Sequence, residues 1–145
     1  PEDTTYVHEG LLSLAGCYAI VAVDSFGNES ELSNVVCVDN CSDYNLPNVF
    51  TPNGDGFNDL FIPRMPIRFI DHIDIKIFDS WGNLVFTSTD PMINWNGKDI
   101  KSGLDVSEGT YFYSCMVYEI TVAGISPFPE PKEGYIHLFR QGLSE

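Results

Sequence analysis

Residues 46–61 read LPNVFTPNGDGFNDLF, a run in which two Pro, two Gly, three Asn and two Asp stand between short apolar groups. Proline lacks a backbone N–H donor and glycine lacks a side chain, so neither suits a helix interior or a central strand. The composition therefore predicts a tight polar loop that opens a new folded unit at about residue 46.

The chain after this loop shows the alternation of apolar and polar residues that is typical of β-strands. Within residues 67–78, isoleucine occupies positions 73, 75 and 77, and polar or charged residues lie between them, which is a period of two. Residues 110–118 and 135–140 have the aromatic and β-branched composition of further strands. Glycine-containing turns separate these segments, and none shows sustained helical periodicity. We expect an all-β protein in which residues 46–145 form an antiparallel immunoglobulin-like β-sandwich.

Residues 1–38 form a separate unit, followed by a polar linker at residues 39–45. The centre of this unit, GCYAIVAVDSFGNESELSNVVCV at residues 16–38, is typical of two strands around a Gly-Asn turn. In this segment the unit resembles the last strands of a fibronectin type III module. Because the earlier strands of such a module are missing, we expect this unit to be poorly packed unless it leans on its neighbour. We also expect the chain to be the tail of a longer one.

Four cysteines, none of them in a CxxC pair, favour disulfides and an oxidising compartment over a zinc site. Cys17 and Cys37 each lie ten residues from the turn centre at Gly27, so they should face each other across the hairpin and form a disulfide. Cys41 and Cys115 would then form a second disulfide between the linker and a strand of the second unit. Free buried thiols are the alternative to these disulfides.

The net charge is −14, from 21 acidic and 7 basic residues. Such a charge repels nucleic acid and anionic lipid, so we expect neither as a partner. The longest apolar run, residues 17–23, is too short for a membrane-spanning helix. If the protein is exported, its signal peptide is expected upstream of residue 1. The motifs GxSxG, HExxH, GxGxxG and the P-loop do not occur in the sequence, which argues against an enzyme.

Four segments of the second unit carry a resemblance to a known family. They are PNVFTPNGDGFNDLF (47–61), KIFDSWGNLVFTS (76–88), NWNGKD (94–99), and EGTYFYSCMVYE (108–119) followed by GYIHLFR (134–140). In them the unit resembles the gliding motility-associated C-terminal domain, also called the type B sorting domain of type IX secretion. NWNGKD departs from the WDG that is more usual in that family. The resemblance marks a sorting motif formed by Pro47, Asn48, Phe50, Thr51, Pro52, Asn53, Gly54, Asp55, Gly56, Asn58 and Asp59.

This resemblance implies a C-terminal export tag on a large surface or secreted protein, often an adhesin used in gliding or attachment. An outer-membrane translocon and an accessory β-barrel protein would recognise the folded domain. The protein would pass through the periplasm to the cell surface or the extracellular space. We further expect the edge of the last strand to dock on this receptor by strand addition. The docking residues proposed for it are Tyr135, His137, Phe139 and Arg140.

The polar loop also offers oxygen ligands at the spacing of part of a calcium-binding loop. These candidate ligands are Asn53, Asp55, Asn58 and Asp59. A carboxylate from elsewhere, such as Asp99 or Asp105, could complete a Ca2+ site. The alternative is that the loop side chains cap their own backbone in turns.

Two other functions compete with the export tag. One is a calcium- or carbohydrate-binding adhesion module, in which the aromatic residues at 111, 112, 113 and 118 form a sugar platform rather than core. The other is a structural end cap on a fibronectin-like stalk. Trp81 and Trp95, each beside a glycine-containing turn, are expected to close the ends of the sandwich rather than bind a ligand.

Overall fold

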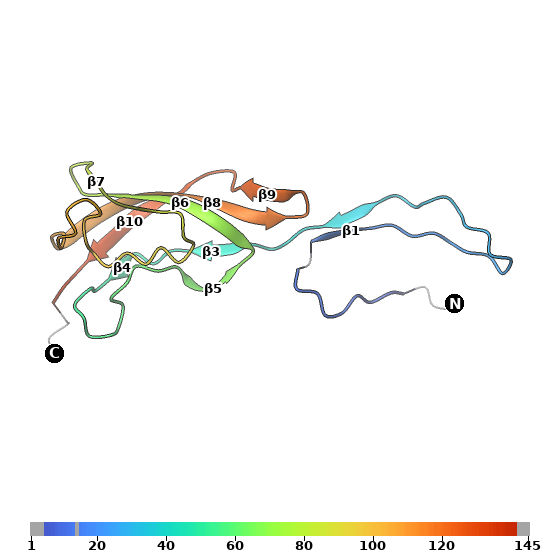
Figure 1. Ribbon diagram of the computed structural model, residues 1–145, viewed down its shortest axis with the longest axis horizontal. Coiled ribbons are helices and arrows are strands. Elements are labelled where there is room, and N and C mark those ends of the chain that lie inside the picture. Colours follow the sequence, from blue (N-terminus) through green and yellow to red (C-terminus); the bar gives the residue numbers. More distant parts are fainter. Residues whose placement is uncertain (1–4, 14, 142–145) are drawn as a thin grey trace.

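The structure is a computed structural model that describes residues 5–13 and 15–141. Within these ranges it contains β-strands and no helix, which confirms the all-β fold class (Figure 1). The strands are β1 (Gly16–Tyr18), β2 (Val36–Val38), β3 (Asp43–Asn45), β4 (Val49–Phe50), β5 (Arg64–Arg68), β6 (Ile70–Phe78), β7 (Leu84–Ser88), β8 (Gly109–Thr121), β9 (Gly124–Pro127) and β10 (Lys132–Leu138).

The main sheet, which we call the front sheet, has the strand order β4-β10-β8-β6-β7, and β9 extends it by pairing with the end of β8. β4 runs parallel to β10, whereas the other neighbours are antiparallel. β3 and β5 form a separate antiparallel pair, and this pair makes the smaller second layer of the sandwich. The fold is therefore the expected sandwich, with one broad sheet and one small one.

The chain crosses from the small sheet to the front sheet at Pro47, between β3 and β4. Proline cannot donate a ladder hydrogen bond, so it suits a point where a strand leaves one partner and joins another. On its N-terminal side Tyr44 of β3 is buried, and its hydroxyl donates to the Pro91 carbonyl at 2.6 Å. The sandwich thus begins within the segment expected to be a linker.

The core lies between the two layers and follows the alternation seen in the sequence. Ile73, Ile75 and Ile77 of β6 are fully buried, opposite inward residues of β8. A second part of the core is aromatic, because Trp95 from the segment between β7 and β8 packs against Phe50 with ring centroids 5.1 Å apart. The core is therefore closed by a loop residue as well as by strands.

The start of β8 carries a hydrogen bond that is typical of immunoglobulin-like sandwiches. The Tyr111 ring is buried in the core, and its hydroxyl donates to the Ser107 carbonyl, four residues upstream, at 2.6 Å. This arrangement is a tyrosine corner, which fixes the entry of the chain into the strand.

Residues 16–38 project from the sandwich as a long two-stranded hairpin, which we call the arm (Figure 1). Cys17 and Cys37 are register partners in it and form the expected disulfide. Its turn is held by the Asp24 carboxylate, which accepts the N–H groups of Phe26 and Asn28. Apolar side chains remain exposed, with Phe26 at 90% and Ile20 at 77%. The arm is therefore poorly packed, as expected.

The segment between the arm and β3 is tied to the β8–β9 hairpin by side-chain hydrogen bonds. The Asp39 carboxylate accepts the Val122 N–H at 2.9 Å, and the Asn40 amide donates to the Ile120 carbonyl at 2.8 Å. Ser42 donates to the Glu119 carboxylate. These contacts fix where the arm leaves the sandwich.

The disulfide expected between Cys41 and Cys115 is wrong. Both cysteines are free, with Cys41 exposed and Cys115 buried in the core opposite Ile75. The neighbouring Asn40 contacts Ile120, five residues beyond Cys115 on the same strand, which is about 16 Å at about 3.3 Å per residue. A disulfide requires the two Cα atoms to lie within about 7 Å, so this path of the chain excludes the pairing.

The two free thiols should react at very different rates. Burial raises the pKa of Cys115 to about 12, so it holds almost no thiolate at neutral pH, whereas Cys41 is open to solvent. A disulfide-exchange reagent that reports released thiolate should titrate one thiol in the native protein and a second only after unfolding. Two rapidly reacting thiols in the native protein, or no reactive thiol until a reductant is added, would contradict this assignment.

Candidate functional site

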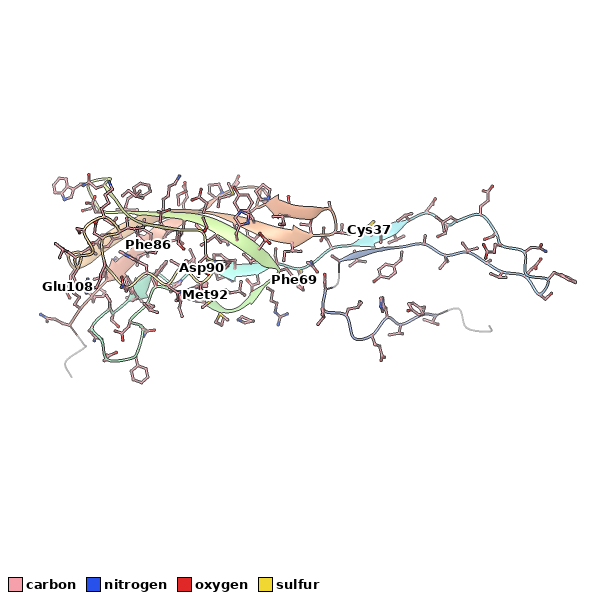
Figure 2. The ribbon with its side chains drawn as sticks, in the orientation of Figure 1. Cys37, Phe69, Phe86, Asp90, Met92 and Glu108 are labelled. Carbon is pink, nitrogen blue, oxygen red and sulfur yellow. A yellow bond between two sulfur atoms is a disulfide. The ribbon has the colours of Figure 1, made fainter. Side chains whose placement is uncertain are left out.

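The segments that carry the family resemblance meet at the end of the sandwich farthest from the arm. The polar loop after β4, residues 51–59, and the end of β10 lie there (Figure 1), as does Glu108 (Figure 2). Phe61 and Trp95 form an isolated antiparallel β-bridge, in which the Phe61 N–H donates to the Trp95 carbonyl at 2.8 Å. Segments far apart in the sequence therefore form one compact cluster of loops.

Arg140 holds this cluster together at the end of β10. Its guanidinium donates to the backbone carbonyls of Pro52 at 3.1 Å and Gly97 at 2.7 Å, and twice to that of Val106 at 3.1 and 3.3 Å. Asp105 lies 3.6 Å away as its ion-pair partner. The charged group expected to face a receptor is thus engaged inside the domain, so we describe Arg140 as a clamp.

The backbone beside the clamp is fixed by Glu108. One oxygen of its carboxylate accepts the N–H groups of both Arg140 and Gln141. These hydrogen bonds lower the pKa of Glu108, and the bond from Arg140 has the larger effect. Gly97, whose carbonyl accepts from Arg140, has no room for a side chain. An added Cβ there would lie 2.9 Å from the Pro52 side chain. Glu108 and Gly97 lie in segments that carry the family resemblance, but their partners lie in other segments, so the sequence alone does not assign them these contacts.

The 51–59 loop is organised around the Asp59 carboxylate. One of its oxygens accepts the N–H groups of Gly54 at 2.7 Å and Asn53 at 3.0 Å, and the other accepts that of Gly56 at 2.8 Å. Gly54 and Gly56 have φ values of 80° and 88°, which L-residues with side chains rarely adopt. These bonds hold the pKa of Asp59 below its usual value, with the Gly54 N–H as the largest cause.

The same geometry fits turn capping better than calcium binding. Asp55 accepts the Phe57 N–H at 2.8 Å and the Asn53 side-chain amide at 3.0 Å, so the expected ligand oxygens already face N–H donors. Asp99 caps its own turn through the Ser102 N–H, and Asp105 faces cationic groups. In the described residues no group of three or more His, Cys, Asp or Glu side chains is placed to hold a metal. The loop side chains therefore cap their own backbone in turns, which is the alternative to the Ca2+ site.

The loop should loosen in acid, and Asp59 should be the cause. A carboxyl whose pKa is lowered on folding contributes its full stabilisation above the unfolded-state value, here 3.8, and loses it as pH falls through the folded-state value. The amide proton resonances of Gly54 and Gly56 should therefore titrate below pH 3.8. In Asp59→Asn this titration should vanish. A midpoint at or above 3.8 in the unaltered protein would contradict the assignment.

Three of the four expected docking residues lie together on the outer face of β10. The ring centroids of Tyr135 and His137 are 5.0 Å apart, and those of His137 and Phe139 are 6.1 Å apart. The edge of β10, however, is not fully open for the strand addition expected from the sequence. β4 pairs with it at His137 and Leu138, so strand addition is blocked at this part of the edge.

The aromatic residues 111, 112, 113 and 118 do not form a shared platform. Tyr111 is buried, and the Tyr113 ring lies over Gly134, where an added Cβ would meet the Tyr113 hydroxyl at 2.7 Å. Phe112 faces outward, and Tyr118 stacks on the His72 ring with centroids 4.1 Å apart. The strand alternation thus sends them to opposite faces of the sheet.

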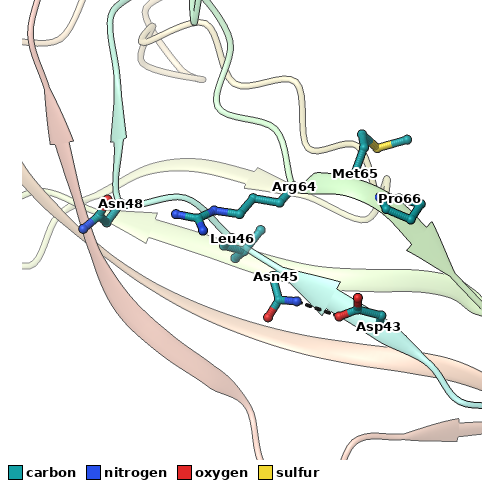
Figure 3. A pocket seen from close by; sticks show the side chains of 7 residues that line it. All are labelled: Asp43, Asn45, Leu46, Asn48, Arg64, Met65 and Pro66. Atoms are coloured by element: carbon teal, nitrogen blue, oxygen red, sulfur yellow. Dashed lines mark hydrogen bonds between the residues drawn. The ribbon is translucent and has the colours of Figure 1, made fainter.

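A polar hollow lies between β3 and the start of β5 (Figure 3). Its side chains include Arg64 and two amides, and the Asn45 amide donates to the Asp43 carboxylate at 2.6 Å. The residues that line it include no His, Cys, Ser or Thr. Its one carboxylate, that of Asp43, is engaged by the Asn45 amide.

Comparison with known proteins gives one family. The model of the CHU_C Type IX secretion signal domain matches residues 44–138. No curated protein and no solved structure matches the chain. Among the described residues no helix is long and apolar enough to cross a membrane. The matched segment starts in β3 and ends with the last residue of β10, which means that it covers the whole sandwich and stops short of the arm. The chain belongs to the CHU_C type IX secretion signal domain family.

Proposed function

We propose that the sandwich is the sorting signal that the type IX outer-membrane translocon and an accessory β-barrel protein recognise on the protein that carries it. The observation that carries this proposal is the coincidence between the family match and the fold. The match begins at Tyr44, the buried residue of β3, and ends at Leu138, the last residue of β10. The unit of recognition is therefore a complete folded sandwich rather than a linear peptide.

The proposed route runs through the periplasm to the cell surface or the extracellular space. The arm supports an oxidising stage of this route, because Cys17 and Cys37 are joined by a disulfide. We further propose that the arm links the sandwich to cargo, a surface protein used in gliding or adhesion. We assign the contact with the receptor to Tyr135, His137 and Phe139. Arg140 instead holds the loops of the sandwich together by donating to their carbonyls.

Deletion of residues 134–145 from the carrying protein tests this function. It removes most of β10, which pairs with both β4 and β8, and with it the Arg140 clamp. Cargo should then remain inside the cell at an unchanged level of synthesis. Substitution of Phe26 by Ser, in the arm, serves as the control and should leave export intact. Undiminished surface cargo after the deletion would refute the proposal.

A further inference from the structure

A row of apolar side chains crosses the outer face of the front sheet. Leu84 of β7 is the register partner of Phe78 on β6, Phe78 is the partner of Phe112 on β8, and Phe112 is the partner of Tyr135 on β10. Register partners on antiparallel strands point to the same face, so the side chains of Phe78, Phe112 and Tyr135 lie side by side. Leu84 pairs with Phe78 just after a register shift between Ile77 and Phe78. We call these four residues the apolar row.

The row faces solvent rather than the core. Phe112 is 49% exposed and Tyr135 is 47% exposed, whereas their strand neighbours Tyr111 and Ile136 are buried. A shallow hollow lies over three members of the row, Phe78, Phe112 and Tyr135, and its lining is completed by Tyr113, Ser114, Glu133 and Gly134. A solvated sheet face normally carries polar residues at such positions. Single exposed apolar residues need no explanation, but a contiguous group of them marks an interaction surface.

The row continues along β10 to the edge of the sheet. His137 and Phe139 follow Tyr135 on the same face, and Phe139 is 50% exposed. Val49 of β4, the register partner of His137, is 45% exposed. The apolar surface therefore spans the front sheet from β7 to β4 and includes the docking residues proposed above.

The surroundings of the row point to the chemistry of its partner. The adjacent row consists of Thr87, Lys76, Ser114 and Glu133, which are register partners of one another in turn. Polar groups thus border the apolar row on that side, as at protein interfaces with an apolar centre and a polar rim. The net charge of −14 favours a basic partner and disfavours an anionic lipid surface.

We propose that the apolar row is the surface on which the protein receptor of the secretion apparatus docks. The receptor would cover it with an apolar patch bordered by Lys and Arg side chains. This proposal rests on the sorting function proposed above and specifies its contact surface. Aromatic residues in such a position supply much of the binding energy of a protein interface.

The test uses the full chain fused to the C-terminus of a reporter, supplied with an upstream signal peptide and expressed in a host with type IX secretion. The double variant Phe112→Thr/Tyr135→Thr removes two half-exposed rings and keeps residues that suit a strand. The control Ile20→Thr/Phe26→Thr removes two apolar side chains that are more exposed but lie in the arm. Surface reporter should fall about tenfold or more for the row variant, since each tenfold step in affinity corresponds to about 1.4 kcal/mol. The arm variant should stay within about twofold of the unaltered fusion.

A charge variant keeps the test decisive if the double variant fails to fold. Glu133→Lys places a cation beside the row, where it would repel a basic receptor rim, and Glu29→Lys makes the same change in the exposed turn of the arm. Glu133→Lys should lower export severalfold at an unchanged melting temperature, and Glu29→Lys should not. Equal export of the two charge variants would overturn the proposed partner chemistry.

The outcomes separate this inference from the function on which it rests. If the unaltered fusion is not exported, the sorting function fails. If it is exported and a folded row variant is exported equally well, the docking surface is wrong. Vesicles of neutral lipid and of neutral lipid with anionic lipid serve as a further probe. Row-dependent binding to either vesicle would overturn the assignment of a protein partner, whereas an absence of such binding supports it.

Discussion

Substitution of Trp95 by alanine is expected to lower the free energy of unfolding by about 3–5 kcal/mol. Trp95 is fully buried, and its ring lies 5.1 Å from Phe50, 5.5 Å from Tyr111 and 6.0 Å from Phe86 between centroids. Its indole N–H donates to the Lys98 carbonyl at 2.9 Å. One side chain from a loop therefore contacts three strands of the front sheet. Such a loss would consume much of the stability of an ordinary domain, about 5–15 kcal/mol.

Urea unfolding followed by circular dichroism measures this effect. Trp95→Phe should recover part of the loss, because it keeps an aromatic ring but not the hydrogen bond to Lys98. Trp81→Ala is the matched control, because Trp81 is 88% exposed in the turn between β6 and β7. It should change stability by less than about 0.5 kcal/mol. Similar losses at the two tryptophans would contradict the described core.

Substitution of Arg140 by methionine should lower the free energy of unfolding by about 2–4 kcal/mol, because hydrogen bonds that involve a charged group contribute about 1.5–3 kcal/mol each and are not additive. Its side chain is three-quarters buried, and the guanidinium donates to three carbonyls from two loops, residues 51–59 and the segment between β7 and β8. Arg140→Lys keeps the charge, but a single ammonium cannot reproduce the planar fork, so it should recover only part of the loss.

Urea unfolding of both variants checks this prediction, with Arg64→Met as the control. Arg64 is exposed at the start of β5, so its loss should change stability by less than about 0.5 kcal/mol. The Gly54 and Gly56 amide resonances should also shift in Arg140→Met, because the Pro52 carbonyl within the same loop loses its donor. Full stability of Arg140→Lys, or an effect no larger than that of Arg64→Met, would show that the clamp is not what holds the loops.

Local patterns in the sequence predict the strands but not the contacts between distant segments. Ile73, Ile75 and Ile77 of β6 alternate strictly with polar residues, so their burial follows from the period of a strand. The Cys17–Cys37 pair follows from the symmetry of a hairpin about its turn, which is also local information. The pairing of Cys41 with Cys115 depends on where the linker meets β8, and elimination among four cysteines cannot supply that position.

The candidate site shows the same limit. The composition of the 51–59 loop predicts turn-capping side chains, and Asp59 caps the loop through three N–H groups. Trp81 and Trp95 have similar local sequences, yet one is exposed and the other is fully buried, because only Trp95 meets the core through its bridge to Phe61. Likewise, the sequence places Arg140 at an exposed strand end, and only the fold brings three carbonyls from two loops around it.

Transfer of export to foreign cargo tests the account most directly. A reporter that normally stays inside the cell would be fused to the full chain, supplied with an upstream signal peptide, and expressed in two matched hosts, one of which lacks the type IX translocon. The account predicts reporter on the surface or in the medium of the competent host and retention in the other. Retention in both hosts, or release from both, would contradict it.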